Sequence, residues 1–344
     1  DNDTFPLWYN LEVEQERDDV RACNLSYLQT DWYISQMKRP YYNSPGLPIS
    51  WEEKDYMPGK NEVVWVENRL NAPLEVKKAF QFLHSDDPRT KRDGEGYLPS
   101  DQLYVFAPDS QKIMFKKARR FTRSEMMVMD MLSTNEWKRP IYFAVTIGND
   151  YHLGLDPYLE LTGLAYRITP ERSADGRHRV NTEVMYDNML HKFKYGNMNV
   201  PGIYIDENTM RMCRTHRMMF MELAEALYNE GKHDKCLEVL DFAEEMLPGY
   251  NISYDYTSAT MAAYYYQLGE IEKANAIMTK VADNSVEYMA WGASLPKEQR
   301  ASSQSTLQQQ LAILGYVLQN FERYQQKELF NQYYDLYVQY ASVR

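Results

Sequence analysis

The sequence predicts an α/β fold followed by an all-α region, and a change of pattern along the chain carries that prediction. Up to about residue 170, short apolar or β-branched runs alternate with amphipathic stretches. This alternation is typical of an α/β layer with a mainly parallel sheet. From about residue 207 only helical periodicity remains. We therefore expect an α/β domain at 1–170, a connecting segment at 171–206 and a helical domain at 207–344.

Local patterns predict the elements of the first domain in order. Large apolar side chains recur near helical spacing in 4–16, and 30–39 has the form of a short helix capped by Thr30 or Asp31. The remaining elements follow from apolar runs, cap residues and proline or glycine content. We expect strands at 19–25, 62–66, 101–107 and 139–147, helices at 73–84 and 124–132 (capped by Ser124), and an irregular segment at 41–60.

The run Asp-Asn-Asp at 1–3 consists of residue types that cap helices, and it precedes the first expected helix. In an α/β layer such a helix normally follows a buried strand, so we expect a central parallel strand immediately before Asp1. Asp1 and Asp3 would then lie at the carboxyl edge of the sheet. The strand at 19–25 would pair beside the strand that we expect before Asp1. There the carboxylates could hold a divalent cation or bind a sugar, or they could simply cap the helix.

The helical domain shows an internal repeat. Residues 223–248 and 261–284 share small residues at helix contacts and a glycine at the turn, Gly231 in the first and Gly269 in the second. This pattern resembles tetratricopeptide repeats, in which each unit is a pair of antiparallel helices. Residues 299–341 are helical but less regular, and we expect them to form a third, capping pair.

Composition argues against several classes of function. A net charge of −11 argues against nucleic-acid binding, which needs an excess of Lys and Arg. No apolar run approaches the roughly 20 residues of a membrane-spanning helix, so we expect the chain by itself to be soluble. Cys23, Cys213 and Cys236 lie far apart and the His residues show no ligand spacing, so neither a disulfide framework nor a metal site is expected. Nucleotide-binding and nucleophile motifs are also missing; we expect no cofactor and assign no catalytic residue.

Aromatic residues suggest a groove at the expected sheet edge. Trp8 and Tyr9 lie in the first expected helix, and Asp31 and Trp32 open the second. Trp and Tyr combine an apolar ring with a polar group, as sugar and peptide grooves require, although most such rings are ordinary packing. Arg139 precedes the most apolar strand, where it could clamp a carboxylate or phosphate, or serve the turn that enters the strand.

A run of cations is the remaining candidate. Residues 112–123 contain six bases and no acid, although the chain as a whole is acidic. Such a stripe could contact anionic headgroups or a lipid-linked phosphate donor, or it could be a solvated face. The six bases are Lys112, Lys116, Lys117, Arg119, Arg120 and Arg123.

Four phrases of the sequence carry a resemblance to a known family. They are DNDTFPLWYNLEVEQERDDVRACNLSYLQTDWYISQMK, NEWKRPIYFAV, LDPYLELTGLAYRITPE and MYDNMLHKFKYGN. Together they resemble a family of large membrane proteins of Bacteroides-like bacteria, related to the eukaryotic transmembrane protein O-mannosyltransferases of the GT-C type. The resemblance covers most of the chain, and its most specific part is the first phrase.

The resemblance implies where the chain belongs in a larger protein. It implies the C-terminal, periplasmic region of an inner-membrane glycosyltransferase, with a block of membrane helices upstream as its partner. In such enzymes an acid in an early membrane loop and a lipid-phosphate donor carry the reaction, so no residue of this chain inherits a catalytic role. We expect the region to be non-catalytic by itself and its repeats to bind acceptor protein or a partner.

Two other functions stay open at this point. The chain could be an interaction scaffold with no role in glycosyl transfer, in which the helical repeats bind a protein partner. It could also be an independent hydrolase or transferase that uses the Asp-Asn-Asp run and Arg139.

Overall fold

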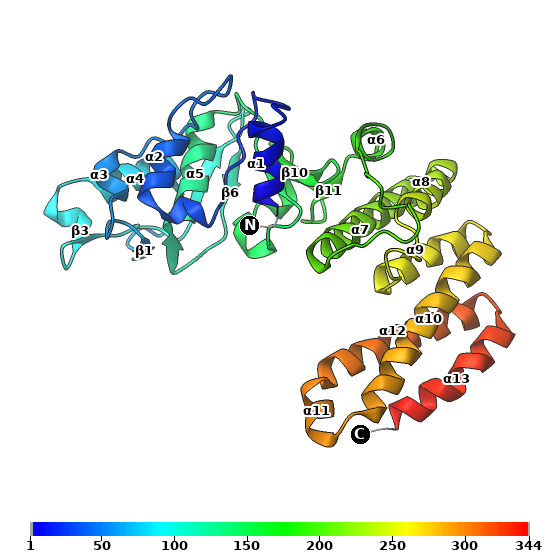
Figure 1. Cartoon of the computed structure of the whole chain (residues 1–344). Helices are drawn as coiled ribbons and strands as arrows, with labels where there is room; N and C mark the ends of the chain where they lie inside the picture. Colours follow the sequence, from blue (N-terminus) through cyan, green and yellow to red (C-terminus); the bar gives the residue numbers. More distant parts are fainter. Residues whose placement is uncertain (1–2, 343–344) are drawn as a thin grey trace. The chain divides into compact units, whose positions relative to one another are not determined.

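The computed structural model describes residues 3–342, which form two compact units (Figure 1). The α/β unit comprises the chain up to Leu161 together with Ala165–Arg179. The helical unit comprises Thr162–Leu164 and the chain from Val180 onward. The predicted order, α/β first and all-α second, is confirmed.

The α/β unit combines short helices with short strands. Its helices are α1 (Thr4–Glu12), α2 (Asp31–Met37), α3 (Glu53–Tyr56), α4 (Val76–His84) and α5 (Arg123–Asn135). Its strands are β1 (Val63–Trp65), β2 (Leu74–Glu75), β3 (Lys91–Arg92), β4 (Glu95–Gly96), β5 (Leu103–Phe106), β6 (Lys112–Met114), β7 (Arg120–Thr122), β8 (Tyr142–Ala144), β9 (Leu159–Leu161) and β10 (Ala165–Ile168), and β11 (Arg179–Val180) follows where the chain passes to the helical unit.

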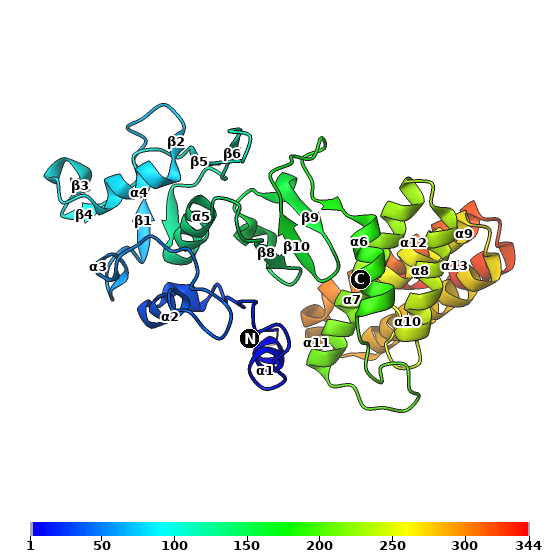
Figure 2. The ribbon, with the colours of Figure 1, turned by 90° about the horizontal axis from the view of Figure 1, so that it is seen from above.

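The strands form small mixed sheets rather than the expected mainly parallel layer. β2 and β5 pair in parallel, whereas β1 with β7, β5 with β6, and β10 with both β8 and β9 pair antiparallel. Figure 2 shows β8, β9 and β10 near one another in the unit. Connections such as the turn from β5 to β6 are too short to cross over a sheet face, and short connections join antiparallel neighbours.

One predicted strand, at 19–25, is absent from the described structure. Its backbone is irregular because a neighbouring side chain takes the place of a ladder partner. The Asn24 amide nitrogen donates to the Tyr33 hydroxyl at 2.9 Å, and the Asn24 side chain donates to the Thr4 hydroxyl, also at 2.9 Å. Asn commonly makes local bonds of this kind in place of regular structure. The segment therefore joins α1 to α2 and does not extend a sheet.

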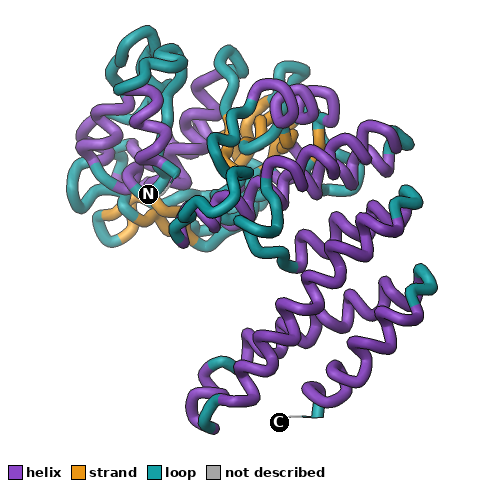
Figure 3. Tube along the Cα trace, turned by 45° about the vertical axis from the view of Figure 1, so that its right-hand side comes forward, coloured by secondary structure: helices purple, strands orange, loops and turns teal. Residues whose placement is uncertain are grey.

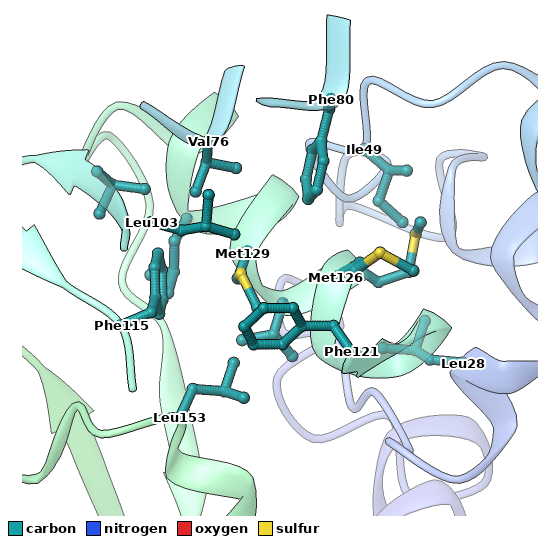
Figure 4. Close-up of a cluster of buried hydrophobic side chains, with 14 of the residues drawn as sticks. Leu28, Ile49, Val76, Phe80, Leu103, Phe115, Phe121, Met126, Met129 and Leu153 are labelled. Atoms are coloured by element: carbon teal, nitrogen blue, oxygen red, sulfur yellow. The ribbon is translucent and has the colours of Figure 1, made fainter. Parts of the chain in front are cut away.

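The core of the α/β unit surrounds α5 (Figure 4). Phe121, Met126 and Met129 lie at its centre and are fully buried. Side chains from helices, a strand and the connecting loops close around them: Leu28, Ile49, Val76, Phe80, Leu103, Phe115 and Leu153. A capping box starts α5, with Thr122 as the cap and Glu125 as its partner, so Ser124 is not the cap that we predicted.

The helical unit contains α6 to α13. These helices are α6 (Thr182–Asp187), α7 (Glu207–Asn229), α8 (His233–Met246), α9 (Tyr256–Gln267), α10 (Ile271–Ser294), α11 (Lys297–Ser302), α12 (Gln304–Arg323) and α13 (Lys327–Ala341). Within the described part of the chain no strand follows β11, as Figure 3 illustrates. The prediction of a purely helical region from about 207 is confirmed.

Consecutive helices pack as pairs, α7 with α8, α9 with α10 and α12 with α13 (Figure 1). The first two turns contain Gly231 and Gly269, which have φ of 74° and 85°, and the third contains Gln325 at 59°. A residue with positive φ after a helix satisfies its last carbonyls, and glycine does so without strain. The predicted turn glycines are therefore where the pattern placed them. The assignment to tetratricopeptide-like repeats stays a prediction.

Candidate functional site: an aromatic cleft

A run of aromatic rings connects α1 to α2. The Trp8 ring stacks on Tyr27 with centroids 6.1 Å apart, and Tyr27 in turn lies 6.0 Å from Trp32 and 5.5 Å from Tyr33. Each aromatic pair adds about 0.5–1.5 kcal/mol beyond the burial of its area. The two tryptophans predicted as groove residues are thus fixed in one local structure, although 24 residues separate them in the chain.

Three of these rings, Trp8, Trp32 and Tyr33, border a cleft of about 200 Å³ in the α/β unit, which we call the aromatic cleft. Trp8 comes from α1 and Trp32 and Tyr33 from α2, while Arg21, Tyr41 and Tyr42 come from the irregular segments on either side of α2. The structure therefore brings Trp8 and Trp32 together and adds lining residues that the sequence did not single out, among them Arg21, Tyr41 and Tyr42. Tyr41 and Tyr42 fall in a stretch rich in proline and glycine, and their adjacency was the signal available.

The carboxylates of the aromatic cleft already bond to neighbouring side chains. The Tyr41 hydroxyl donates to the Glu12 carboxylate, and this hydrogen bond is the main reason that the pKa of Tyr41 is raised. Asn43 donates to the Asp18 carboxylate at 2.6 Å. Arg21 donates to the carbonyl of Gln36 at 3.0 Å and stacks over the Tyr41 ring. Aromatic faces are therefore the principal free surface, which suits an apolar side chain or the CH face of a sugar ring.

Arg139 holds the segments that build this cleft. Its guanidinium donates to the Ser44 hydroxyl at 2.7 Å, to the Pro45 carbonyl at 3.1 Å and to the Asp19 carbonyl at 3.4 Å. Burial lowers the pKa of this guanidinium, although it stays a cation. The expected clamp on a ligand carboxylate or phosphate is thus occupied by the protein itself, because its donors meet backbone and hydroxyl oxygens. Arg139 is a positioning residue for the loops on both sides of the cleft.

Three other candidates lie outside the aromatic cleft. Asp3 occupies the position before α1, but its side chain makes no cap and instead accepts a hydrogen bond from the Thr146 hydroxyl. The Tyr9 hydroxyl donates to Glu14 at 2.6 Å, which raises the pKa of Tyr9. Asp31 lies in the first turn of α2, where its negative charge interacts favourably with the helix dipole. Asp1 lies outside the described residues.

The cations at 112–123 do not form one surface. Arg123 is buried: its guanidinium donates to the carbonyls of Gln29, Met57 and Lys60, so it cannot contact a headgroup. Its pKa is lowered by burial, an effect that the charges of Glu62 and Asp31 partly offset.

The other five cations differ among themselves in exposure and contacts. Lys116 donates to the Asp150 carbonyl and lies 3.6 Å from Glu125. Lys112 lies over Tyr104 and Arg120 over Trp65. Lys117 and Arg119 are exposed, so the surface charge of this run is smaller than the sequence suggested.

Within residues 3–342, no three His, Cys, Asp or Glu side chains gather as a metal ion would require. None of the helices in that range combines the length and the apolar character needed to cross a bilayer. Cys23, Cys213 and Cys236 are free thiols, and burial raises the pKa of Cys23 and Cys236 to about 12.

The chain is thus a two-unit protein, with the aromatic cleft in its α/β unit and paired helices in its helical unit. The chain belongs to the family of TMEM260-associated domain 2, whose model matches residues 1–188 of its 344 residues. The match therefore covers the α/β unit and the first helix of the helical unit. Comparison with curated proteins and with solved structures gave no match.

Proposed function

We propose that the chain is the non-catalytic region of a TMEM260-like, GT-C-type membrane glycosyltransferase of Bacteroides-type bacteria, similar to protein O-mannosyltransferases. Its place is the periplasmic face of the inner membrane, beside its own membrane domain, where it binds the acceptor protein or a partner. The match to TMEM260-associated domain 2 over residues 1–188 carries this proposal. Support comes from the aromatic cleft, because its free surfaces suit a sugar ring or an apolar side chain and its carboxylates already bond internally.

Measurement of two reactions in the full-length parent protein tests the proposal. Trp32 is a suitable target because it borders the cleft and is more than half exposed, so Trp32→Ala removes a contact surface without opening the core. Transfer of sugar to acceptor protein should fall several-fold, whereas hydrolysis of the lipid-linked donor by water should continue. Tyr9→Ala is the matched control, since Tyr9 is equally exposed on α1 but outside the cleft.

Two results would contradict the proposal. Glycosyl transfer by the isolated 344-residue chain would show that it is catalytic by itself. An equal loss of donor hydrolysis and acceptor transfer in Trp32→Ala would place the residue in the reaction and not in acceptor binding.

The alternative function is an interaction scaffold with no role in glycosyl transfer. One observation favours it: the family match ends at residue 188, so the helix pairs from α7 onward lie outside the matched region. Under this alternative Trp32→Ala leaves glycosylation unchanged.

A further proposal concerns the exposed cations Lys112, Lys117, Arg119 and Arg120, which would contact anionic headgroups of the membrane. Vesicle binding that is indifferent to their replacement by Gln would refute it.

A further inference from the structure

The helical unit contains a second, larger cavity, which results from unequal helix lengths. Helix α9 has 12 residues and its partner α10 has 24, so α10 runs far past the beginning of α9 (Figure 1). The Asn284 side chain, near the middle of α10, donates to the carbonyl of Tyr254, two residues before α9 begins. Helix α12 packs along α10. A cavity of about 890 Å³ is left between the overhanging half of α10, α12 and the segment before α9. We call it the overhang groove.

A buried arginine fixes the loop that forms one wall of the overhang groove. Arg217 of α7 is 1% exposed, and its guanidinium donates to the carbonyls of Leu247, Ile252 and Ser253 at 2.8–2.9 Å. The same guanidinium lies over the Tyr254 ring. Ser253 and Tyr254 line the groove. This wall is therefore built in advance of any ligand, which reduces the entropy lost on binding.

The side chains that line the overhang groove have the composition of a protein interface. They include Trp291, Tyr254, Tyr256, Tyr288 and Arg214, and Lys is missing among them. Trp, Tyr and Arg are enriched at the energetic centres of protein interfaces, and Lys is depleted there. Trp291 and Tyr288 are about half exposed, at 48% and 50%, although they border a concave surface. Large rings left open in a hollow are typical of a binding site.

Hydrogen-bonding groups of the overhang groove are free for a ligand. Within residues 3–342, the side chains of Arg214, Tyr288, Trp291 and Gln309 make no hydrogen bond to another residue. A Gln amide offers both a donor and an acceptor, as does every peptide unit, so Gln309 can pair with a polypeptide backbone. Asp255 is already used as the cap of α9.

We propose that the overhang groove binds an extended polypeptide segment. Tyr288 and Trp291 contact the side chains of that segment, and Gln309 pairs with its backbone. Arg214 and Glu287 supply opposite charges, which suits a ligand of mixed charge rather than a neutral sugar chain. This proposal is independent of the aromatic cleft and holds whether or not the parent protein transfers sugar.

Selection of short random peptides by the intact 344-residue chain tests this proposal. We expect enriched peptides whose binding, measured by fluorescence anisotropy, weakens at least about tenfold in Trp291→Ala. Gln309→Leu should weaken it less, because it removes one amide and keeps the size of the side chain. Tyr204→Ala is the matched control, since Tyr204 is 91% exposed in the same unit and outside the groove. Circular dichroism verifies that each variant is folded.

Hydrogen exchange locates the bound peptide. Protection should appear in 281–291 and 309–313, which belong to α10 and α12. The proposal would be overturned if enriched peptides bound the Trp291→Ala variant as tightly as they bind the unsubstituted chain. It would also be overturned if the selection enriched no peptide. Binding of manno-oligosaccharides that depends on Trp291, without peptide binding, would assign the groove to a glycan instead.

Discussion

In each unit a fully buried arginine binds three backbone carbonyls, and the two arginines differ in which segments of the chain they hold. Arg123 joins Gln29, Met57 and Lys60 in the α/β unit, and Arg217 joins three carbonyls of the loop before α9 in the helical unit. A planar guanidinium can serve several carbonyls at once, as an ammonium cannot. In both units one side chain therefore replaces the regular hydrogen bonds that irregular backbone lacks.

The two units differ in what the fixed loops leave available. In the aromatic cleft, Glu12 and Asp18 already bond to neighbouring side chains, so recognition depends mainly on ring faces. In the overhang groove, polar side chains such as Gln309 are free. The loops of the aromatic cleft, held by Arg139, thus carry carboxylates that are satisfied in advance, whereas the wall held by Arg217 borders a groove with free polar groups.

The largest effect should follow from Arg217→Met. The substitution keeps the volume but leaves three carbonyls without donors, of which those of Leu247 and Ile252 are buried. Each buried carbonyl left without a donor costs about 1–3 kcal/mol. We expect the free energy of unfolding of the helical unit to fall by about 4 kcal/mol, measured by native-state hydrogen exchange of α7–α10. Arg217→Lys should give an intermediate loss. A loss below about 1 kcal/mol would show that these carbonyls find water or other donors.

Arg123→Met should destabilise the α/β unit by a smaller amount, about 3 kcal/mol. The bond to the Met57 carbonyl is long, at 3.3 Å, so less is lost when it breaks. Glu62→Gln is the control, because Glu62 lies 3.8 Å from the guanidinium but is largely exposed. A long ion pair whose carboxylate is largely exposed contributes little, so this control should change stability by less than about 1 kcal/mol. Equal losses in the two variants would assign the effect to the ion pair.

Gly46→Ala should destabilise the loop that Arg139 holds. A Cβ at this position would lie 2.2 Å from the Lys38 carbonyl oxygen, and a backbone atom cannot turn away as a side chain can. Overpacking of this kind costs about 1–3 kcal/mol, which thermal unfolding followed by tryptophan fluorescence would detect. Gly148→Ala is the matched control, with its nearest contact at 3.9 Å, and should change stability by less than about 0.5 kcal/mol.

The smallest expected effect is a loss of stability at acidic pH. Burial lowers the pKa of His216 in the helical unit and of His84 in the α/β unit. The unfolded chain then binds protons more readily than the folded one, so the free energy of unfolding falls as pH drops below about 6.5. His216→Gln should flatten this dependence in the helical unit alone, and His84→Gln in the α/β unit alone. Hydrogen exchange measured at about pH 7 and about pH 5 gives the pH dependence of stability for each unit. If one variant reduced that dependence in both units, the assignment of one histidine to each unit would be wrong.

Sequence patterns predicted the elements that depend on periodicity. The helix pairs and the short strands at β1, β5 and β8 follow from apolar spacing, and the turn glycines from their conformational freedom. The segment at 19–25 misled the prediction because its apolar residues resemble a strand, whereas Asn24 bonds to side chains of α1 and α2. A local sequence pattern does not reveal the hydrogen-bond partners of such a residue, because those partners lie in other elements.

The sites were only partly predictable for the same reason. Trp8 and Trp32 stood out as aromatic residues near helix starts, but Tyr41 and Arg21 join them only after irregular segments fold. The buried role of Arg123 depends on carbonyls more than 60 residues away, so the sequence could not separate it from exposed cations. The overhang groove depends on α10 continuing to Ser294, ten residues beyond the end that the repeat pattern predicted.

The unequal lengths of α9 and α10 also bear on how this region can diverge during evolution. The α9–α10 hairpin and the turn at Gly269 are set by the residues that face each other along the shorter helix. Beyond Asn284, an insertion of one turn in α10, matched by one in α12, would lengthen the overhang groove by about 5.4 Å and leave that hairpin unchanged. Descendants of this chain could therefore acquire new ligand preferences through paired insertions, while the scaffold that carries them is conserved.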